Sequence, residues 1–432
     1  MLVSACMKLK KSMYNIAVET RENGDVLYYN SASGAMAWLN SDIQNAFLMD
    51  DMSGIEKEDY YSLLFQNGFV VDVAIDEYSR YLFKSREFIM ELNSDFVSYT
   101  IALTMECNLR CVYCFESGRN YGVASNDTLD DIYDFITSQV TILKKRKLHI
   151  TWFGGEPLLS YDQMIKLSTR LILFCKRNNV IYDASMITNG TLLDEEKLSE
   201  LIVAHKLENI QITLDGDFDF YRKYKNASMN QFTRVINNIR LIGKNKKVNL
   251  TLRLNTCKDN KESLIHIVNE IIKDSEFHCY LYAGKMMNYG SDLFEEMEEK
   301  EFFEFEKKID LIASKFPEYK NITKKRLKPK GANCGALSCN RCAIDARGRL
   351  YRCEHHINDC EFAVGDVKQG FYRNEIDSRF LFSDYPSKCR KCSVFPVCMG
   401  GCTSDRIIYG KEVDCKIMYN MVINNVKIIN NI

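Results

Sequence analysis

The chain has 432 residues, of which 46% are hydrophobic, and a formal net charge of -1 at neutral pH. The near balance of acidic and basic residues leaves no global electric field that would attract nucleic acid or an anionic membrane. The sequence starts without a secretory signal and holds no apolar run of the roughly 18 residues that a membrane-spanning helix needs. We therefore expect a cytoplasmic protein of more than one domain, with no nucleic-acid or membrane partner.

Residues 1–96 predict a small winged-helix-like domain of the α+β type. Two runs rich in β-branched and aromatic residues flank the segment Glu22-Asn23-Gly24-Asp25, which is a typical hairpin signal. Two helical stretches and a third short strand follow. The expected elements are strands at 14–18, 26–29 and 68–72 and helices at 42–47 and 57–67.

Residues 97–320 predict repeated β/α units, because apolar β-branched runs alternate with longer amphipathic stretches. Parallel strands joined by right-handed helical crossovers would form an open, partial (β/α)6 barrel of the α/β class. The expected strands are 99–104, 148–153, 184–188, 210–214, 249–254 and 278–283. The expected helices are 129–143, 163–174, 195–205, 232–242 and 261–272.

Cysteine is the unusual component of the composition. The chain contains 17 cysteines, an odd number that does not suit a disulfide framework in a protein without secretory features. Three lie between residues 107 and 114, and ten lie between residues 334 and 415. Thiolate ligands for metal explain this clustering better, so we predict two metal-binding regions.

The first cysteine group stands just after the first expected barrel strand. Cys107, Cys111 and Cys114 are separated by three and by two residues. Iron-sulfur clusters take cysteine thiolates, and a cubane normally needs four, so three cysteines leave one iron open. An open metal position can bind a substrate or cofactor through nitrogen and oxygen donors. A zinc loop or reactive surface thiols are the alternatives for this triplet.

Polar clusters follow the next expected strands, at the ends where barrel active sites are built. They are Gly154, Gly155 and Glu156 after the second strand, Asn189 after the third, Asp215 after the fourth, and Arg253 and Asn255 at the fifth. Alone, each cluster is more often a simple turn. Their equivalent positions on successive strands favour a single shared site.

The C-x3-C-x2-C loop after the first strand of a β/α barrel resembles the radical S-adenosylmethionine (SAM) superfamily. This resemblance implies a 4Fe-4S cluster on the cysteine triplet, whose open iron chelates the amino and carboxylate groups of SAM. It also implies that the Gly-Gly-Glu segment holds the SAM amino group and that the other strand-end residues line the cofactor site. Tyr113 would pack near the adenine, with plain loop packing as its alternative role. Reductive cleavage of SAM would give methionine and a 5'-deoxyadenosyl radical.

The C-terminal region, residues 321–432, carries the second cysteine group. Its order includes Gly348-Arg-Leu-Tyr-Arg-Cys353 and Cys389-x2-Cys392-x5-Cys398-x3-Cys402, with Cys415 after twelve intervening residues. This order closely resembles the SPASM domain of peptide-maturing radical SAM enzymes, which holds two auxiliary 4Fe-4S clusters. A terminal apolar run at 417–428 predicts a closing helix.

The SPASM resemblance assigns the cysteines to two clusters. It implies a distal cluster on Cys389, Cys392, Cys398 and Cys415, and a proximal cluster on Cys334, Cys353 and Cys402. For the fourth proximal ligand, Cys339 lies at the favoured spacing and Cys342 is its rival, and an iron left open for substrate is a third possibility. A pair of zinc-ribbon sites is the alternative to both clusters.

Glu354 directly follows Cys353. Sulfatase-maturing relatives carry an aspartate at this position, and that aspartate acts as a base. The resemblance therefore implies Glu354 as a catalytic base, although the extra methylene group departs from the pattern. A solvated surface carboxylate is the alternative.

The resemblance as a whole implies a peptide maturase with three 4Fe-4S clusters and SAM, which installs a thioether or carbon-carbon crosslink in a ribosomally made precursor peptide. Flavodoxin or ferredoxin would supply electrons, and the N-terminal domain would bind a leader peptide or serve only as a packing cap. An anaerobic sulfatase maturase that forms formylglycine is one alternative, disfavoured by Glu354 and by the N-terminal region. A non-catalytic iron-sulfur electron carrier is the other, and it leaves the Gly-Gly-Glu segment unexplained.

Overall fold

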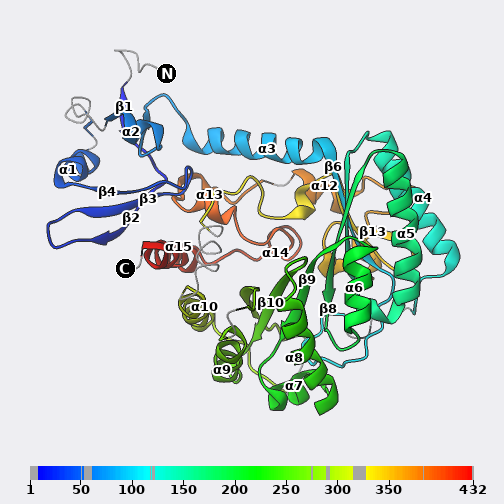
Figure 1. Cartoon of the computed structure of the whole chain (residues 1–432). Helices are drawn as coiled ribbons and strands as arrows, with labels where there is room; N and C mark the ends of the chain where they lie inside the picture. The colour runs from blue at the N-terminus through cyan, green and yellow to red at the C-terminus, as the bar shows by residue number, and fades with distance from the viewer. Residues whose placement is uncertain are drawn as a thin grey trace. The chain divides into compact units, whose positions relative to one another are not determined.

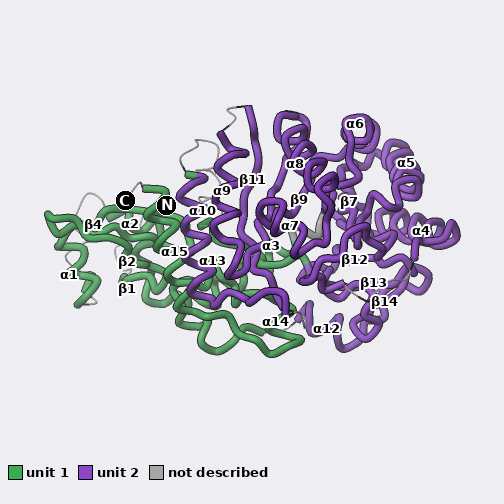
Figure 2. The backbone as a smooth tube through the Cα atoms, turned by 90° about the horizontal axis from the view of Figure 1, so that it is seen from below, with its two compact units in different colours: residues 1–91, 314–335, 383–432 green, residues 92–313, 336–382 purple. Residues whose placement is uncertain are grey.

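The structure is a computed structural model that describes residues 8–49, 51–52, 61–116, 118, 122–273, 276–288, 292–314, 327–382 and 384–430. The chain forms two compact units, which Figure 2 distinguishes by colour. Unit 1 combines residues 1–91, 314–335 and 383–432, and unit 2 combines residues 92–313 and 336–382. The predicted C-terminal region is thus shared between both units, and the division into three domains at residues 96 and 320 remains a prediction.

Unit 2 is built on a parallel sheet in which β6 to β11 are neighbours in chain order (Figure 1). Every adjacent pair of these strands is parallel. The predicted α/β class and its six parallel strands are confirmed. The strands are β6 (Phe96–Ala102), β7 (Lys147–Phe153), β8 (Ile181–Thr188), β9 (Leu207–Leu214), β10 (Asn249–Thr256) and β11 (Tyr280–Lys285).

Amphipathic helices connect these strands and bury their apolar faces. In the first of them Leu129, Ile132 and Ile136 are buried, and the Ser125 side chain caps its N-terminus by accepting from Thr128 N. The five predicted helices are confirmed. The pattern does not predict α7, which is short and carries aromatic and basic residues without an aliphatic stripe, or the charge-rich α10. The helices are α4 (Asn126–Ile142), α5 (Tyr161–Arg177), α6 (Glu195–Val203), α7 (Phe218–Lys225), α8 (Met229–Gly243), α9 (Lys261–Ile272) and α10 (Glu299–Ala313).

Short strands from the cysteine-rich region extend the same sheet beyond β6. β12 (Arg341–Ile344) pairs with β6 in parallel, and β13 (Arg349–Tyr351) returns antiparallel to β12. β14 (Gly365–Asp366) and β15 (Gly370–Phe371) complete the sheet. Segments of two to four residues are too short for a periodic signal, so the sequence pattern does not predict them. Residues 336–382 are therefore positioned by the barrel's own sheet.

Unit 1 begins with two small antiparallel sheets. The predicted hairpin is confirmed as β2 (Asn15–Thr20) and β3 (Val26–Asn30), and β4 (Met36–Leu39) adds to β3 as an unpredicted third strand. The predicted strand at 68–72 forms as β5 (Val70–Asp72). It pairs with β1 (Leu9–Lys11) rather than with the hairpin.

Helices complete unit 1 at both ends of the chain. α1 (Ser41–Met49) confirms the first predicted helix, and α2 (Tyr61–Gln66) confirms the second over the residues that the structure describes, since 57–60 lie outside them. The long α3 (Glu77–Asp95) is not predicted by the sequence pattern. Near the C-terminus follow α13 (Phe395–Cys398), α14 (Thr403–Ile407) and the predicted closing helix α15 (Cys415–Asn430).

The N-terminal hairpin and the C-terminal cysteine segment share one hydrophobic core. The hairpin side chains pack with residues beside or within α13 and α15. The buried members of this core are Ile16, Val18, Leu27, Tyr29, Leu327, Val394, Val397, Cys398, Val422 and Val426. Lys427 of α15 also pairs with Glu19 of β2. The N-terminal strands thus supply apolar side chains against which the C-terminal cysteine segment packs.

Within the part of the chain that the structure describes, no helix is long and apolar enough to cross a membrane.

We expect the I16A substitution to lower the free energy of unfolding of unit 1 by roughly 2–5 kcal/mol, because a buried isoleucine of the shared core is truncated. Urea unfolding followed by circular dichroism measures this change. The control L48A removes a side chain that is 81% exposed on α1 and should change the free energy by less than about 0.5 kcal/mol. Equal unfolding midpoints for I16A and the wild type would contradict the shared core.

Candidate active site

The cysteine triplet lies in the loop that follows β6, at the edge of the sheet where all the parallel strands end. Cys114 N donates to Cys111 O at 3.1 Å, which folds the second half of the loop into a tight turn. Two N-H groups approach the Cys107 sulfur, from Leu109 N at 3.4 Å and from Asn189 Nδ2 at 3.7 Å. Donors of this kind stabilise a thiolate, which is the form that binds metal.

The two glycines after β7 let the chain pass directly against the loop that leads to the cysteines. A Cβ on Gly154 would lie 2.1 Å from Thr104 O, and one on Gly155 would lie 2.3 Å from Glu106 O. Gly155 N and Glu156 N donate to these same carbonyl oxygens, at 3.2 Å and 2.9 Å. Only glycine permits this approach, so the two residues position the cysteine loop whatever else they bind.

Glu156 ties the end of β7 to the end of β8. Its side chain is fully buried, and its carboxylate accepts from Leu158 N at 3.1 Å, from Asn189 N at 2.8 Å and from Thr188 Oγ1 at 2.8 Å. Burial raises the pKa of Glu156, and these donors oppose the rise. The carboxylate is therefore held rigidly at the strand ends, and its contact with a SAM ammonium group stays a prediction.

Asn189 connects the β8 end to the cysteine loop. Besides approaching Cys107, its amide donates to Asn108 Oδ1 at 2.9 Å, and its own oxygen accepts from Thr191 N at 2.9 Å. Asn108 Nδ2 in turn donates to Thr191 Oγ1 at 2.8 Å. The structure thus brings Asn189 next to the cysteine triplet, as the sequence predicts for a shared site.

Asp215 reaches the same loop from the end of β9. Its Oδ2 accepts from the Tyr113 hydroxyl at 2.5 Å, and its Oδ1 lies 3.5 Å from the ammonium of Lys225. Burial raises the pKa of Asp215, opposed by Lys225 and by the Tyr113 hydroxyl. On β10, Arg253 Nε donates to Asn255 Oδ1 at 2.9 Å. The predicted polar residues therefore stand at successive strand ends, although the role of each toward a cofactor remains a prediction.

Glu354 and its neighbours lie close to the end of the cysteine loop. Glu354 is exposed and accepts from Thr100 Oγ1 of β6 at 3.1 Å. The ring of His355 stacks on Phe115, the residue after Cys114, with ring centres 4.5 Å apart and planes at 19°. Sequence reasoning does not single out His355 or Phe115, because nothing in their spacing indicates that residues 240 positions apart would meet.

The proximal cysteine set is divided between the two units. Cys339 and Cys353 belong to unit 2, whereas Cys334 and Cys402 belong to unit 1, so their assembly into one cluster stays a prediction. Cys339 is exposed just before β12. Its rival, Cys342, is buried within β12 and faces Tyr99 across the ladder, and burial raises its pKa to about 12. The choice of Cys339 over Cys342 as the fourth ligand stays a prediction.

The remaining cysteines belong to none of the predicted clusters. Cys175 is buried in α5, and Cys257 is buried after β10. Cys6 lies outside the described residues. Cys360 is exposed in a short 3-10 turn, η5 (Cys360–Phe362), seven residues after Cys353, and sequence reasoning leaves it unassigned.

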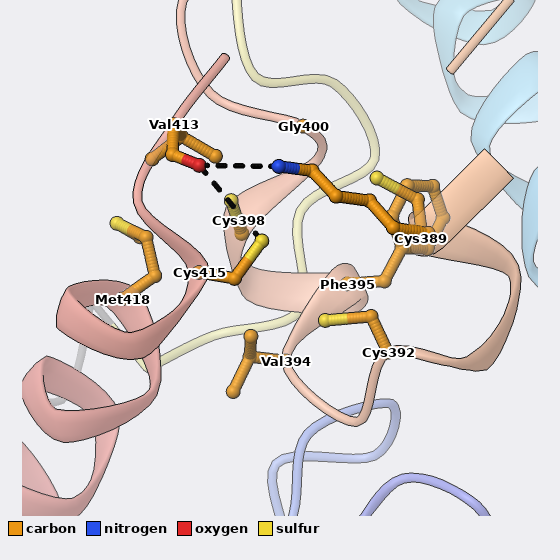
Figure 3. A pocket seen from close by; sticks show the side chains of 10 residues that line it. Cys389, Cys392, Val394, Phe395, Cys398, Gly400, Val413, Cys415 and Met418 are labelled. Atoms are coloured by element: carbon orange, nitrogen blue, oxygen red, sulfur yellow. Dashed lines mark hydrogen bonds between the residues drawn. The ribbon is translucent and has the colours of Figure 1, made fainter. Parts of the chain in front are cut away.

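The four cysteines of the predicted distal cluster line one pocket in unit 1 (Figure 3). The lining residues are Lys388, Cys389, Cys392, Val394, Phe395, Cys398, Gly400, Val413, Cys415 and Met418. The four thiols come from three different segments, the turn before α13, α13 itself and the start of α15. The structure therefore brings this predicted set together in one pocket, and its binding of a cluster stays a prediction.

Backbone N-H groups face two of the pocket sulfurs. Burial raises the pKa of Cys392 and of Cys398, and hydrogen bonds from the backbone after each cysteine oppose the rise. For Cys398 these donors are the N-H groups of Gly400 and Gly401. Together with Met399 they form a run of three left-handed residues, with φ of +52° at Met399, +74° at Gly400 and +78° at Gly401. Consecutive N-H groups turned toward one point form an anion-binding concavity. This geometry fits cluster thiolates.

Among the described side chains, no three His, Cys, Asp or Glu residues stand in the geometry for binding a single metal ion. In a cubane each thiolate binds a different iron. The fit of the two cysteine sites to clusters therefore rests on their thiols and on the N-H donors around them.

Residues 101–271, which include the cysteine loop and the strand ends through Asn255, match the Radical SAM superfamily. This chain carries a Radical SAM domain. The family implies one 4Fe-4S cluster and SAM as cofactors.

Known proteins resemble this radical SAM enzyme over different lengths. A cysteine-type anaerobic sulfatase-maturating enzyme of Clostridium perfringens is 22% identical over 333 residues, which cover 68% of this chain and 85% of that protein. A probable GTP 3',8-cyclase of Methanococcus maripaludis is 34% identical over 118 residues, which cover 27% of this chain and only 36% of that protein.

Two solved structures share the fold of this radical SAM enzyme. Streptococcus suis SuiB bound to the precursor peptide SuiA has a TM-score of 0.52 at 13% identity, covering 91% of this chain and 95% of SuiB. The enzyme anSMEcpe with bound AdoMet and a peptide has a TM-score of 0.62 at 18% identity, covering 78% of this chain and 100% of that one. At these identities the likeness establishes the fold.

We expect the G155A substitution to abolish SAM binding, because the added Cβ would lie 2.3 Å from Glu106 O and 2.5 Å from Met105 O and would displace the cysteine loop. Isothermal titration of the anaerobically reconstituted protein with SAM measures this. The control G370A places its Cβ where nothing lies within 4 Å. It adds only local strain at the left-handed φ of +78° in β15, and it should bind SAM like the wild type. Wild-type affinity in G155A would show that the contact between the two loops is dispensable.

Proposed function

We propose that this radical SAM enzyme is a peptide maturase that carries three 4Fe-4S clusters. The observation that carries the proposal is the four-cysteine pocket of unit 1, because SPASM-type peptide maturases have further cluster sites in addition to the SAM site. An electron carrier without catalysis would not need the strand-end site. The auxiliary clusters and the reduced thiols favour a cytoplasmic location, where flavodoxin or ferredoxin would donate the electrons.

The residues at the strand ends would hold the SAM-binding cluster and its cofactor. Cys107, Cys111 and Cys114 would supply three thiolates, with Asn189 Nδ2 donating to the first of them at 3.7 Å. When bound, the cluster and SAM supply a 5'-deoxyadenosyl radical that abstracts a hydrogen atom from the substrate. Asp215 and the segment around Glu156 would orient the polar groups of SAM. The buried positions of these two carboxylates keep bulk water away from that edge.

The auxiliary sites would divide as the cysteine order predicts. Cys389, Cys392, Cys398 and Cys415 would hold the distal cluster in the pocket of unit 1. Cys334, Cys339, Cys353 and Cys402 would hold the proximal cluster. The zinc alternative has less support in the distal pocket, because the turned N-H groups at Cys398 suit the sulfurs of an anionic cluster.

A peptide substrate is supported by two kinds of observation. Relatives in both solved structures carry a peptide, a precursor peptide in the case of SuiB. In unit 1, β4 pairs only with β3 among the described strands, so its outer edge offers backbone groups to an added strand. Leu48 and Met49 at the end of α1 are 81% and 79% exposed and offer apolar contacts. We propose that a leader peptide binds there and raises the local concentration of its modified segment.

Formation of a thioether or carbon-carbon crosslink is our first proposal, and formylglycine formation is the second. The second is supported by the sulfatase-maturating relative, which aligns with 68% of this chain. It also draws on Glu354, which would act as the base that accepts a substrate proton, with its carboxylate held by Thr100. The crosslinking proposal is supported by the N-terminal sheet, whose β4 edge we propose as the binding site of a leader peptide.

Removing each cysteine set should remove a different function. We expect C107A/C111A/C114A to lose about four irons and all release of 5'-deoxyadenosine from SAM, because a cubane site is deleted. The variant C389A/C392A/C398A/C415A should lose a similar amount of iron but retain 5'-deoxyadenosine release without peptide. Iron analysis and liquid chromatography of anaerobically reconstituted protein measure both. Zinc bound in place of iron, or no release of 5'-deoxyadenosine from fully iron-loaded protein, would contradict the proposal.

The two peptide chemistries leave different products. A crosslink removes two hydrogen atoms from the peptide, and formylglycine leaves an aldehyde that reacts with hydrazine probes, so mass spectrometry separates them. We expect E354Q to lose at least tenfold in peptide product while 5'-deoxyadenosine release continues, because only proton transfer is impaired. The control E361Q changes an exposed glutamate of η5 and should leave product formation intact. Normal product from E354Q would remove Glu354 from the mechanism.

A further inference from the structure

Lys225 is a buried cation behind the cysteine loop of unit 2. It is the last residue of α7, its side chain is 3% exposed, and its ammonium lies 3.5 Å from Oδ1 of Asp215, whose side chain is 0% exposed. Lysine is almost never buried so deeply unless it is paired. Because dehydration of both charges offsets most of their attraction, a buried ion pair is weak support for stability alone. A role in the site explains it better.

The ammonium is fixed from several sides. Lys225 Nζ donates to Thr213 O at 2.9 Å and to the Tyr221 hydroxyl at 3.4 Å, and it lies 4.5 Å from the centre of the Tyr221 ring. Tyr221 is itself held, since its hydroxyl donates to the same Thr213 oxygen at 2.9 Å. The charge therefore has one position and cannot swing out to solvent.

The backbone at Lys225 holds the cysteine loop directly. Arg110 N donates to Lys225 O at 3.1 Å, and Val112 N donates to Tyr224 O at 2.8 Å. These two bonds flank Cys111 on either side. Val112 also packs on the buried apolar cluster that contains Tyr224. The ammonium of Lys225 and the sulfur of Cys111 are thus carried by two segments that are bonded to each other.

The ion pair lies against the cysteine loop. Oδ2 of Asp215 accepts from the hydroxyl of Tyr113, two residues after Cys111, at 2.5 Å, and Oδ1 of the same carboxylate lies 3.5 Å from the Lys225 ammonium. A fixed positive charge near a thiolate favours any state that places more negative charge there, and in a low-dielectric interior this effect is large. Reduction of an iron-sulfur cluster by one electron is such a change.

We propose that Lys225 is a positioning residue whose buried charge raises the reduction potential of the SAM-binding cluster. The inference rests on the proposed assignment of that cluster to Cys107, Cys111 and Cys114. The step involved is the transfer of one electron from a reduced flavodoxin or ferredoxin to the oxidised cluster, with no bond made or broken. Lys225 is not proposed to transfer a proton or to touch the substrate.

The test is a potentiometric titration of the full-length, anaerobically reconstituted protein with dithionite, followed by electron paramagnetic resonance without peptide. The SAM-binding cluster is recognised as the signal whose g values change when SAM is added. We expect K225M to contain about tenfold less reduced cluster at a given potential, which corresponds to a shift of about -59 mV for one electron. The charge-conserving K225R should keep the wild-type potential.

The partner carboxylate gives a control of opposite sign. D215N removes the negative member of the pair but leaves an oxygen for the Tyr113 hydroxyl, so the potential should rise. If K225M and D215N shift the potential in the same direction, distortion of the loop is the cause and the proposal fails. It also fails if K225M leaves the potential unchanged.

Two further outcomes are separable. If K225M does not fold, because Asp215 is left buried without its cation, the D215N and K225R titrations decide the matter by the same signs. A wild-type protein with no SAM-responsive cluster would overturn the cluster assignment, and this inference with it. A SAM-responsive wild-type cluster whose potential ignores D215N and K225M would overturn this inference alone.

Discussion

All the parallel strands of unit 2 end at one edge of one sheet, and the candidate site depends on this constraint. Neighbouring strands are held about 4.8 Å apart by their backbone hydrogen bonds, so residues at successive strand ends have spacings that no side chain needs to set. Glu156 after β7 is bonded to Thr188 and Asn189 at the end of β8. The loop after β6 is then fastened to this row through Gly155. The scaffold fixes the polar residues, and the loop brings the thiols to them.

Thiols in buried surroundings impose the second constraint. Burial opposes the thiolate form, as at Cys111 and Cys389, where it raises the pKa to about 12 and about 11. N-H groups at Cys107 and Cys398 and the ammonium of Lys225 oppose this effect of burial. Because metal binding requires the deprotonated ligand, these groups would favour the clusters that we propose. In unit 1, Cys398 also packs as an apolar residue of the hydrophobic core.

The sequence predicts best what repeats with a regular period. Strands β6 to β11 and most connecting helices follow from alternating apolar runs, and α9 lies at its predicted bounds of Lys261–Ile272. Strands whose only partners are distant in the sequence are not predicted. An example is β12, whose four residues form a strand because they pair with β6. The shared core of unit 1 is not predicted for the same reason, since nothing local links Ile16 to Val422.

The cysteine order can be used for prediction in a way that buried charges cannot. Its resemblance to the SPASM domain groups the four predicted distal cysteines, and the pocket brings those four together. Lys225 gives no comparable signal, because a lysine in a basic helix such as α7 is ordinarily exposed. Lys225 is buried because α7 packs against β9 and the cysteine loop, and this tertiary packing cannot be read from the local sequence. The same holds for the His355 and Phe115 stack beside Glu354.

Unit 1 is made from the first and the last parts of the chain, and this has a consequence for biosynthesis. Ile16 and Tyr29 are made long before their core partners Val422 and Val426. Domains generally fold as units during synthesis, so the contiguous strands of the barrel can assemble while the hairpin of β2 and β3 still lacks these partners. The four-cysteine pocket of unit 1, which contains Cys415, is therefore completed after the barrel strands have been made.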